Sequence, residues 1–418
     1  DADLGTLRAR LAPRLPEAPP FASVDALLAA YALGTHDGSD AATDARIAAY
    51  LGTHWTRYLA TLALALETAP RRVLDVGVAP PFAFQALLAA AVPGVEMAGV
   101  WNRDRPWAQR VESRDGRHPG FDMTLRPANA ERDPLPAADG AHDLVLAMEI
   151  FEHFAVDPLH FLHEAARVLE PGGHLLLTTP NVVSHRGVWK ALNGAAPYSF
   201  GLFVPAEGAQ GRHNREYTPR EVAALAGAAG FETVRLATAD VYDDRIEAEA
   251  ARLLTARGDD FALRGETILY LGRKAGRPAP VPPGLYHGDP GQLAARLALL
   301  DHDRAAGVAR IRAENTAREP WPAGGEWAAA LLLEWADAEG TLRHGEGRVP
   351  LSAPVAPGEA AEITLSLGPA PAGAAEGTLT VEMFQEGAGR FAAAGRANVL
   401  SLPCAEAAFL RLAGAGAP

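Results

Sequence analysis

Cysteine is almost absent from this chain of 418 residues: Cys404 stands alone and has no partner for an internal disulfide. A lone thiol in a long chain fits a reducing compartment, so we expect a cytoplasmic location. Apolar runs are short, and none reaches the ~20 residues that span a membrane. The amino-terminal residues also lack a basic region followed by an apolar stretch, so we expect no signal peptide.

Clustered positive charge is lacking too. The formal net charge is −13, and lysine and arginine form no basic block. Proteins that bind nucleic acid usually carry such a block, so we do not expect a nucleic-acid substrate. What the sequence does contain is an ordinary globular composition, 48% hydrophobic and 21% charged, in a chain too long for a single core. We therefore expect two or three domains.

Within the first 275 residues, the spacing of apolar residues changes near residue 71. Helical spacing of apolar residues predicts helices at 24–33 and 45–66, within a helical extension over 1–70. From 71 to 275, short apolar runs alternate with helical stretches, which is typical of βαβ units. The strands are expected at 71–78, 95–101, 142–149, 174–181, 231–242 and 266–274. The helices are expected at 82–92, 160–169 and 219–230, with a short one at 248–256. This pattern predicts an α/β domain with a mainly parallel, doubly wound sheet that ends in an antiparallel pair.

Beyond this domain the composition shifts again. Residues 276–290 are rich in proline and glycine and read as a linker, and a short helix is expected at 291–307, so 276–305 joins two domains. Short strands with frequent turns follow over 306–418. These strands are expected at 308–317, 326–337, 361–368 and 377–386. They predict an all-β sandwich domain.

The end of the first strand carries the first motif of interest. Residues 75–82 read DVGVAPPF and resemble the first motif of class I S-adenosylmethionine-dependent methyltransferases, an acid followed by Gly-x-Gly-x-Gly. Gly77 matches, whereas Ala79 and Pro81 stand where the later glycines usually are. The resemblance implies a Rossmann-like sheet of seven strands, S-adenosylmethionine as cofactor, and contacts to it from four residues, Asp75, Gly77, Val78 and Ala79. Pro81 is expected in the first turn of the next helix, and an ordinary strand-to-helix turn is the alternative.

The second strand departs from the family pattern. It ends at Trp101 and Asn102, where the family usually has an acid that holds both ribose hydroxyls. Asn102 offers one hydrogen bond in place of the two that a carboxylate accepts. We still place Trp101 and Asn102 in the cofactor site, although the departure leaves open a catalytically inactive member of the fold.

The stretch from 129 to 181 matches the family better. Its order and spacing resemble methyltransferases commonly associated with sugar and polysaccharide modification. The matching segments are 129–136, 143–146, 149–153, 167–177 and 179–181. The resemblance implies that Asn129, Ala130 and Glu131 flank the adenine and that Glu149 faces the methionine end. The Pro-Gly-Gly at 171–173 reads as a structural turn into the fifth strand.

Glu152 and His153 follow the fourth strand on the ligand side of the sheet. His153 is the candidate general base, with Glu152 beside it, because an imidazole titrates near neutral pH. The alternative is that this histidine orients a loop or caps a helix. A metal site of Glu149, Glu152 and His153 is conceivable, but this spacing alone does not indicate one, so no metal is predicted.

A polar loop precedes the helix at 219–230. His213, Arg215 and Tyr217, together with Asn181, are the candidate acceptor-binding residues, because loops at this end of the sheet define the acceptor pocket. Thr218, Pro219 and Glu221 form a predicted capping box and are read as structural. The long segment 184–210 contributes four aromatic residues, Trp189, Tyr198, Phe200 and Phe203. They suit either stacking on sugar rings or packing a small core.

The carboxy-terminal domain is similar to immunoglobulin-like modules appended to bacterial enzymes and transporters of cell-surface polysaccharide. Its tryptophans, Trp321, Trp327 and Trp335, are read as core residues, with glycan binding as the alternative. The domain is expected to serve binding, docking to polysaccharide-assembly proteins or dimerisation. Two functions therefore stay open: O-methylation of a sugar, glycan or glycosylated small molecule, and a non-catalytic scaffold built on the same fold.

Overall fold

The computed structural model describes residues 3–35, 38–276, 279, 293–317, 319–325, 327–369, 372–391 and 399–414. The chain divides into two compact units, Asp1–Ala279 and Pro280–Pro418, and each is described by itself. Within the described ranges, no helix combines the length and the apolar character that crossing a membrane requires.

The first unit is built on one sheet of eight strands in the order β3-β4-β2-β1-β5-β6-β8-β7. The strands are β1 (Arg72–Val76), β2 (Glu96–Trp101), β3 (Trp107–Val111), β4 (Phe121–Pro127), β5 (His142–Met148), β6 (Leu169–Pro180), β7 (Phe231–Ala239) and β8 (Thr267–Lys274). The five central strands β4, β2, β1, β5 and β6 are parallel, whereas β8 runs antiparallel to both β6 and β7. From β1, the strand order runs through β2 and β4 toward one edge of the sheet and through β5 and β6 toward the other. This order creates a switch point between β1 and β5, where ligands bind in doubly wound sheets.

The expected count of seven strands was wrong by one. Neither β3 nor β4 is among the six strands expected by residue range, and β3 adds to the sheet edge antiparallel to β4. Only one residue of β3, Val111, is fully buried. An edge strand of this kind carries little of the apolar pattern from which strands are predicted.

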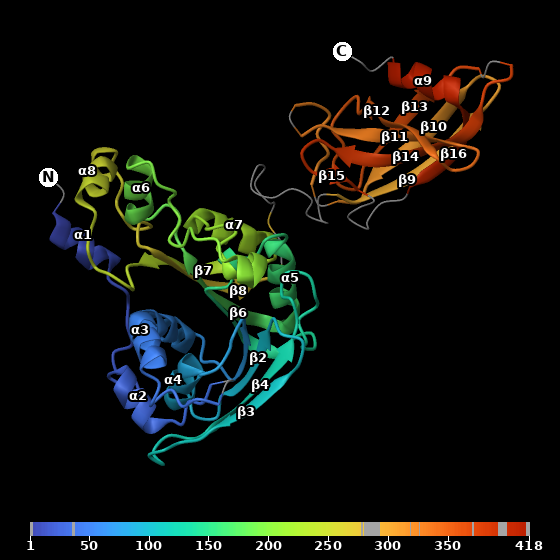
Figure 1. Ribbon diagram of the computed structural model, residues 1–418. Coiled ribbons are helices and arrows are strands. Elements are labelled where there is room, and N and C mark those ends of the chain that lie inside the picture. The colour runs from blue at the N-terminus through green and yellow to red at the C-terminus, as the bar shows by residue number, and fades with distance from the viewer. Residues whose placement is uncertain are drawn as a thin grey trace. The chain divides into compact units, whose positions relative to one another are not determined.

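Helices cover both faces of the sheet, as Figure 1 shows. They are α1 (Leu4–Leu11), α2 (Val24–Ala30), α3 (Ala45–Glu67), α4 (Ala83–Ala91), α5 (Pro158–Val168), α6 (His185–Leu192), α7 (Pro219–Ala228) and α8 (Ala248–Ala256). Helices α2, α3 and α4 lie on one face, and α5 and α7 lie on the other. Buried residues of α2, α3 and α4 form one core with sheet residues such as Val73 and Leu144. The amino-terminal helices are therefore part of the body that holds the sheet.

Two turns differ from expectation, and one helix start agrees. Helix α4 begins only at Ala83, because Phe82 before it has left-handed backbone (φ 56°), so Pro81 lies outside the helix rather than in its first turn. The Pro-Gly-Gly at 171–173 lies within β6, in a bulge between paired residues Leu169 and His174. The capping box of Thr218 and Glu221 at the start of α7 is confirmed, with Pro219 as the first helical residue.

The second unit contains two antiparallel sheets. The first has the order β13-β10-β9, and the second has the order β12-β11-β14-β15, with β16 also paired to β14. The elements are β9 (Ala295–Asp303), β10 (Val308–Asn315), β11 (Ala329–Asp337), β12 (Leu342–Pro350), β13 (Ala360–Ser366), β14 (Glu376–Gln385), β15 (Gly389–Arg390), β16 (Leu400–Ala405) and α9 (Glu406–Gly414). Residues from both sheets share one core, including Leu297, Ile311, Leu333 and Val381. The four strands expected here are confirmed, whereas the immunoglobulin-like topology stays a prediction.

The helix expected at 291–307 was wrong, because this segment contains strand β9. Leu293, Ala295 and Leu297 are buried at every second position, and β9 pairs with β10 across a turn at Gly307 (φ 66°). Leucine and alanine at mixed spacings fit a helix as well as a strand, so pairing with β10 decides the outcome. The linker expected at 276–290 lies mostly outside the described residues.

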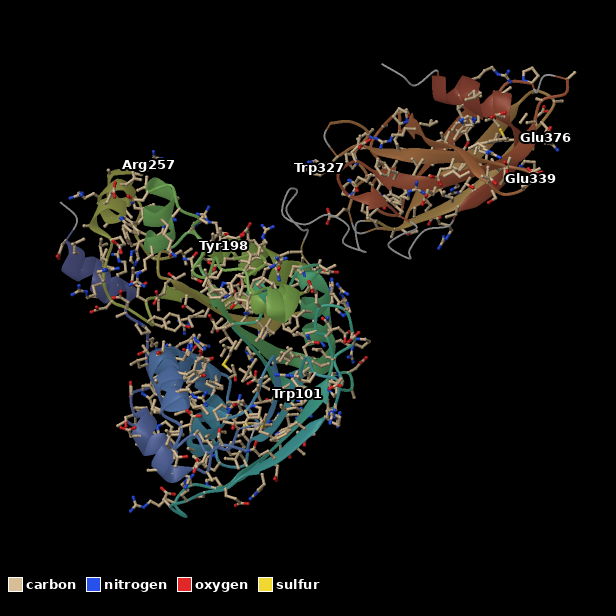
Figure 2. All side chains as sticks on the ribbon, viewed as in Figure 1. Trp101, Tyr198, Arg257, Trp327, Glu339 and Glu376 are labelled. Carbon is tan, nitrogen blue, oxygen red and sulfur yellow. The ribbon has the colours of Figure 1, made fainter. Side chains whose placement is uncertain are left out.

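Three tryptophans of the second unit were expected in its core, with glycan binding as the alternative. Trp321 and Trp335 are buried in the core, and the indole N–H of Trp335 donates to the carbonyl of Cys404 at 2.8 Å. Trp327, labelled in Figure 2, is half-buried. The core interpretation therefore holds for Trp321 and Trp335.

Candidate functional site

Two cavities share a wall at the carboxyl ends of β1 and β5. The β2 cavity, of about 290 Å³, is lined by the ends of β2 and β4 and by His153. The α3 cavity, of about 580 Å³, is lined by α3 and by the turn between β1 and α4. Gly77 and Glu149 line both cavities. The site therefore lies at the switch point of the sheet, where the topology predicts a ligand.

Gly77 occupies a position that requires glycine. Its φ is +86°, and an added Cβ would lie 2.1 Å from Cγ2 of Ile150. Backbone in this region is open to glycine at little cost. Val78 and Ala79 follow it and line the α3 cavity. The predicted motif residues thus form one wall of the cavity, and their contact with a cofactor stays a prediction.

Asp75 at the end of β1 is fully buried beside the same cavity. Its carboxyl accepts a hydrogen bond from the side-chain amide of Gln85. Burial raises the pKa of Asp75 to about 8, although Gln85 and Arg57 oppose the shift. The neutral acid is therefore the main form of Asp75 at pH 7.

Arg57, which is buried, and Glu149, which is half-buried, bring opposite charges to the α3 cavity. Arg57 on α3 is only 4% exposed, and among the described residues its Nε and Nη1 have no hydrogen-bond partner. Glu149 follows β5 with left-handed backbone (φ 55°), and its buried Oε1 also has no partner within the described part of the chain. Burial would lower the pKa of Arg57, but the charge of Glu149 and nearby tyrosines outweigh it and raise that pKa. Buried polar atoms of this kind are usually satisfied, so these two indicate a polar ligand.

The sequence interpretation did not include Arg57. It lies inside α3, which was expected only as part of a helical extension. One signal was present: Arg57 shares a helical stripe with Thr61 and Leu64, at spacings of four and seven residues, and all three are buried. A charged residue on an apolar stripe is unusual enough to mark a candidate site.

The β2 cavity brings together five predicted cofactor residues: Trp101, Asn102, Asn129, Ala130 and Glu131. Trp101, labelled in Figure 2, donates its indole N–H to the carbonyl of Arg105 at 3.0 Å. Glu131 accepts backbone N–H groups from Val156 and Asp157 and so fixes the start of α5.

These positions agree with the order of the family motifs. The carboxylates lining this cavity within the described chain are Glu131 and Glu149. The end of β2 supplies none, as the sequence indicated. Cofactor binding by the predicted residues is not tested by this geometry.

Glu152, His153 and His213 form a compact cluster beside the β2 cavity. Oε1 of buried Glu152 lies 3.9 Å from Nε2 of both histidines. The other oxygen of Glu152 accepts a hydrogen bond from Thr179 at 2.8 Å. Burial and the neighbouring charge of Glu149 raise the pKa of Glu152 well above its usual range. His153 also lines the cavity, so the cluster faces the ligand side of the sheet.

The other candidate acceptor residues mainly contact protein. The side-chain amide of Asn181 donates to the carbonyls of Leu263 and Gly265 at 3.1 and 2.7 Å. Tyr217 is buried, with its ring centroid 4.6 Å from that of Phe151. Arg215 pairs with Glu221 at 2.7 Å. Acceptor binding by Asn181, Arg215 and Tyr217 therefore stays a prediction.

The segment between β6 and α7 presents aromatic side chains of two kinds. Phe203 is 76% exposed and Trp189 is 36% exposed. Phe200 packs against His213, with 5.3 Å between ring centroids. Tyr198, labelled in Figure 2, lies on the same segment. Both predicted roles, packing and an exposed surface for stacking, are thus represented.

Comparisons with known proteins show what the first unit is similar to. Residues 47–236 match a family model described as a methyltransferase domain. A ubiquinone biosynthesis O-methyltransferase of Caulobacter vibrioides is 45% identical over 62 residues, which cover 15% of this chain and 24% of that protein. A malonyl-[acyl-carrier protein] O-methyltransferase of Legionella pneumophila is 29% identical over 134 residues, 32% of this chain and 45% of that protein.

The matched segments span less than half the length of these curated relatives. Among solved structures, a SAM-dependent methyltransferase from Archaeoglobus fulgidus is 15% identical, with a TM-score of 0.33, over 54% of this chain and 99% of that one. Residues 47–236 of this chain are thus similar to methyltransferase domains, and this match supports S-adenosylmethionine as the cofactor.

Proposed function

We propose that the first unit is an S-adenosylmethionine-dependent O-methyltransferase that acts on a hydroxyl of a sugar, glycan or glycosylated small molecule. The observation that carries the proposal is the pair of opposite charges, Arg57 and Glu149, which line the cavity beside the turn at Gly77 and have buried atoms without a partner in the described part of the chain. S-adenosylmethionine supplies an electrophilic methyl group when bound. The remaining chemistry falls to side chains that bind, orient and deprotonate.

The donor set fits this cofactor. Its amino-acid part carries one carboxylate and one ammonium group, which match the guanidinium of Arg57 and the carboxylate of Glu149. Gly77 lines both cavities, so its backbone would border a ligand that spans them. The β2 cavity supplies polar groups on Asn102 and Asn129 and an apolar wall at Trp101 and Ala130, which suits a nucleoside.

His153 is the residue that we assign to the acceptor's proton. Its Nδ1 lies 2.9 Å from the carbonyl oxygen of Arg212, which can only accept a hydrogen bond. This contact places the proton of the neutral ring on Nδ1 and makes Nε2 the basic nitrogen. Nε2 is also the atom that faces Glu152. A neutral imidazole with this tautomer is suited to accept a hydroxyl proton.

Two observations support the acceptor class. The curated relatives are O-methyltransferases by name, which favours a hydroxyl acceptor. The exposed rings of Phe203 and Trp189 offer apolar faces of the kind that stack on sugars. We extend the proposal to the second unit, whose two sheets would dock the enzyme to its glycan substrate, to assembly proteins or to a second copy.

A non-catalytic scaffold is the second candidate, and the end of β2 favours it. Trp101 and Asn102 stand where a carboxylate would hold the ribose. Calorimetric titration of the full chain with S-adenosylmethionine and S-adenosylhomocysteine decides between the two. We expect binding of both. No heat from either at millimolar concentration would exclude the enzyme and leave the scaffold.

The acceptor is then sought by its chemistry. Release of S-adenosylhomocysteine is measured with nucleotide sugars, and with glycosides compared against their own aglycones. Turnover that requires the sugar supports the proposed acceptor class, whereas equal turnover of the aglycones contradicts it. With an active acceptor, His153→Ala should abolish turnover and spare cofactor affinity. Unchanged turnover would remove His153 from the assigned role.

A further inference from the structure

Glu152, His153 and His213 come from two separated segments and converge on one point. Glu152 and His153 lie in a single turn of 3₁₀ helix after β5, and His213 lies in the loop before α7. One ligand atom from each, Oε1 of Glu152 and a ring nitrogen of each histidine, lies within 4.8 Å of the other two. The carboxylate oxygen is 3.9 Å from both Nε2 atoms. Ligand atoms of a tetrahedral zinc ion lie about 3.4 Å apart, as bond lengths of about 2.0–2.1 Å require.

Each of the three side chains makes a hydrogen bond through the atom that faces away from the cluster. Nδ1 of His153 faces the carbonyl of Arg212 at 2.9 Å, and Nδ1 of His213 faces the carboxylate of Glu216 at 2.6 Å. Thr179 donates to the second oxygen of Glu152 at 2.8 Å. Metal-binding histidines almost always donate their outer N–H to a carbonyl or a carboxylate in this way. The supporting groups thus turn both Nε2 atoms toward the same oxygen.

The backbone holds the two segments together without help from the cluster itself. The N–H of Asn214 donates to the carbonyl of Glu152 at 2.8 Å, and its side-chain amide donates to the carbonyl of His153 at 2.7 Å. The N–H of Arg215 donates to the carbonyl of Glu152 at 3.2 Å. The three ligand atoms are therefore brought together by the fold, with little rearrangement needed to close on an ion.

We propose that Glu152, His153 and His213 form a binding site for a divalent transition-metal ion such as Zn²⁺, Mn²⁺ or Co²⁺. Two imidazoles and one carboxylate favour these ions over Mg²⁺ and Ca²⁺, which prefer oxygen ligands alone. The sequence left a site of Glu149, Glu152 and His153 conceivable and predicted no metal, whereas the structure brings His213 to Glu152 and His153. Three protein ligands leave at least one coordination position open, as in catalytic zinc sites.

The open position gives the site a role that rests on the proposed function. His153 lines the β2 cavity, so an ion at this cluster borders the ligand side of the sheet. It would bind the acceptor's oxygen and lower the pKa of that hydroxyl, and the proton would leave to solvent. With the ion bound, His153 is a metal ligand. The ion then promotes deprotonation of the acceptor hydroxyl, the role assigned to His153 alone when no metal is bound.

Co²⁺ alone is the probe, because its visible absorption bands report coordination directly. The full chain is treated with a chelator, dialysed and titrated with Co²⁺. We expect one ion per chain with bands of four- or five-coordinate cobalt, which stoichiometric Zn²⁺ then bleaches. His213→Ala and Glu152→Gln should each weaken Co²⁺ binding at least ten-fold. His160→Ala is the matched control, since His160 on α5 contacts the carbonyl of Asp133 outside the cluster.

Circular dichroism and calorimetry with S-adenosylmethionine accompany each variant, so that misfolding is separated from loss of a ligand. Absence of the bands in the wild-type chain at millimolar Co²⁺ overturns the metal site. Wild-type affinity for Co²⁺ in both His213→Ala and Glu152→Gln overturns it as well. Cofactor binding without Co²⁺ binding would refute this site and leave the proposed function standing. Co²⁺ binding without cofactor binding would do the reverse.

Discussion

Glu216 accepts a hydrogen bond from Nδ1 of His213 at 2.6 Å, and this contact turns the opposite ring nitrogen toward Glu152. The same carboxylate accepts the backbone N–H and the hydroxyl of Ser199 at 2.8 and 2.7 Å. Burial would raise the pKa of Glu216, but hydrogen bonds from His213 and Ser199 outweigh it and lower that pKa. One buried, ionised side chain, that of Glu216, therefore joins Ser199 in the segment between β6 and α7 to the loop residue His213.

Glu216→Gln should weaken Co²⁺ binding by about ten- to a hundred-fold, the usual effect of removing a carboxylate behind a histidine ligand. Glutamine keeps the volume but loses the charge that orients the ring. The affinity is measured from the visible bands of Co²⁺. Glu232→Gln, which removes an exposed carboxylate paired with Arg273, is the control and should bind Co²⁺ as the wild type does. Wild-type affinity in Glu216→Gln would show that the contact does not orient a ligand.

Arg57→Met should weaken binding of S-adenosylmethionine by about ten- to a hundred-fold, because a charge-assisted hydrogen bond contributes about 1.5–3 kcal/mol. Arg57→Lys keeps the charge without the planar donor pair and should fall between the wild type and Arg57→Met. Calorimetric titration gives the affinities, and thermal melts report any change in stability. Arg14→Met removes an exposed arginine paired with Glu67 and serves as control. Equal affinity of Arg57→Met and the wild type would remove Arg57 from the cofactor site.

Gly77→Ala should cost more stability than Gly94→Ala, although the two glycines have nearly the same φ, +86° and +85°. Alanine at Gly94 meets nothing within 4 Å, so it carries only the backbone cost of about 1–2 kcal/mol. Alanine at Gly77 also meets Ile150 and should add about 1–3 kcal/mol. Urea denaturation measures the difference.

The added cost at Gly77 has its own test. In the Ile150→Ala background, Gly77→Ala should cost little more than Gly94→Ala, because the 2.1 Å contact with Cγ2 is gone and only the Cβ at 3.3 Å remains. An unchanged cost of Gly77→Ala in that background would mean that Ile150 is not its cause.

The pH dependence of stability should change in Asp75→Asn. In the folded chain Asp75 keeps its proton up to about pH 8, whereas in the unfolded chain it loses it near 3.8. Between these values the folded state binds more protons, so rising pH favours unfolding, by at most about 1.4 kcal/mol per pH unit. The free energy of unfolding of the wild type, minus that of Asp75→Asn, should therefore fall from pH 5 to pH 8 and level off above.

Urea melts at pH 5, 6, 7 and 8 provide this comparison. Asp122→Asn, which alters an exposed carboxylate, should leave the wild-type slope unchanged. Parallel pH profiles for Asp75→Asn and the wild type would mean that Asp75 is ionised in the folded protein.

The sequence predicted those parts of the molecule whose signal is local. The strand ends at Asp75, Trp101 and Glu149 could be placed because buried parallel strands read as short apolar runs, and the capping box at Thr218 has a fixed spacing. The segment at 295–303 could not, because its leucines and alanines fit a helix until β10 pairs with it. Strands β3 and β4 were also missed, and the place of β3 at the sheet edge depends on β4.

The site was predictable only where one segment supplies it. Glu152 and His153 are neighbours in sequence, and the family motif draws attention to both. The convergence of His213 on Glu152 depends on the fold, because the two lie 61 positions apart and hydrogen bonds from Asn214 and Arg215 bring the loop back. Arg57 was missed because nothing in the sequence links α3 to the end of β5.

Buried residues of helix α3 share a core with the sheet, and the same helix supplies Arg57 to the α3 cavity. A chimera made by exchanging everything from Arg71 onward would receive the glycine turn of one parent and the arginine of the other. Recombination between this chain and a relative should therefore cross over before Ala45, so that the helix and the turn that face each other are inherited together.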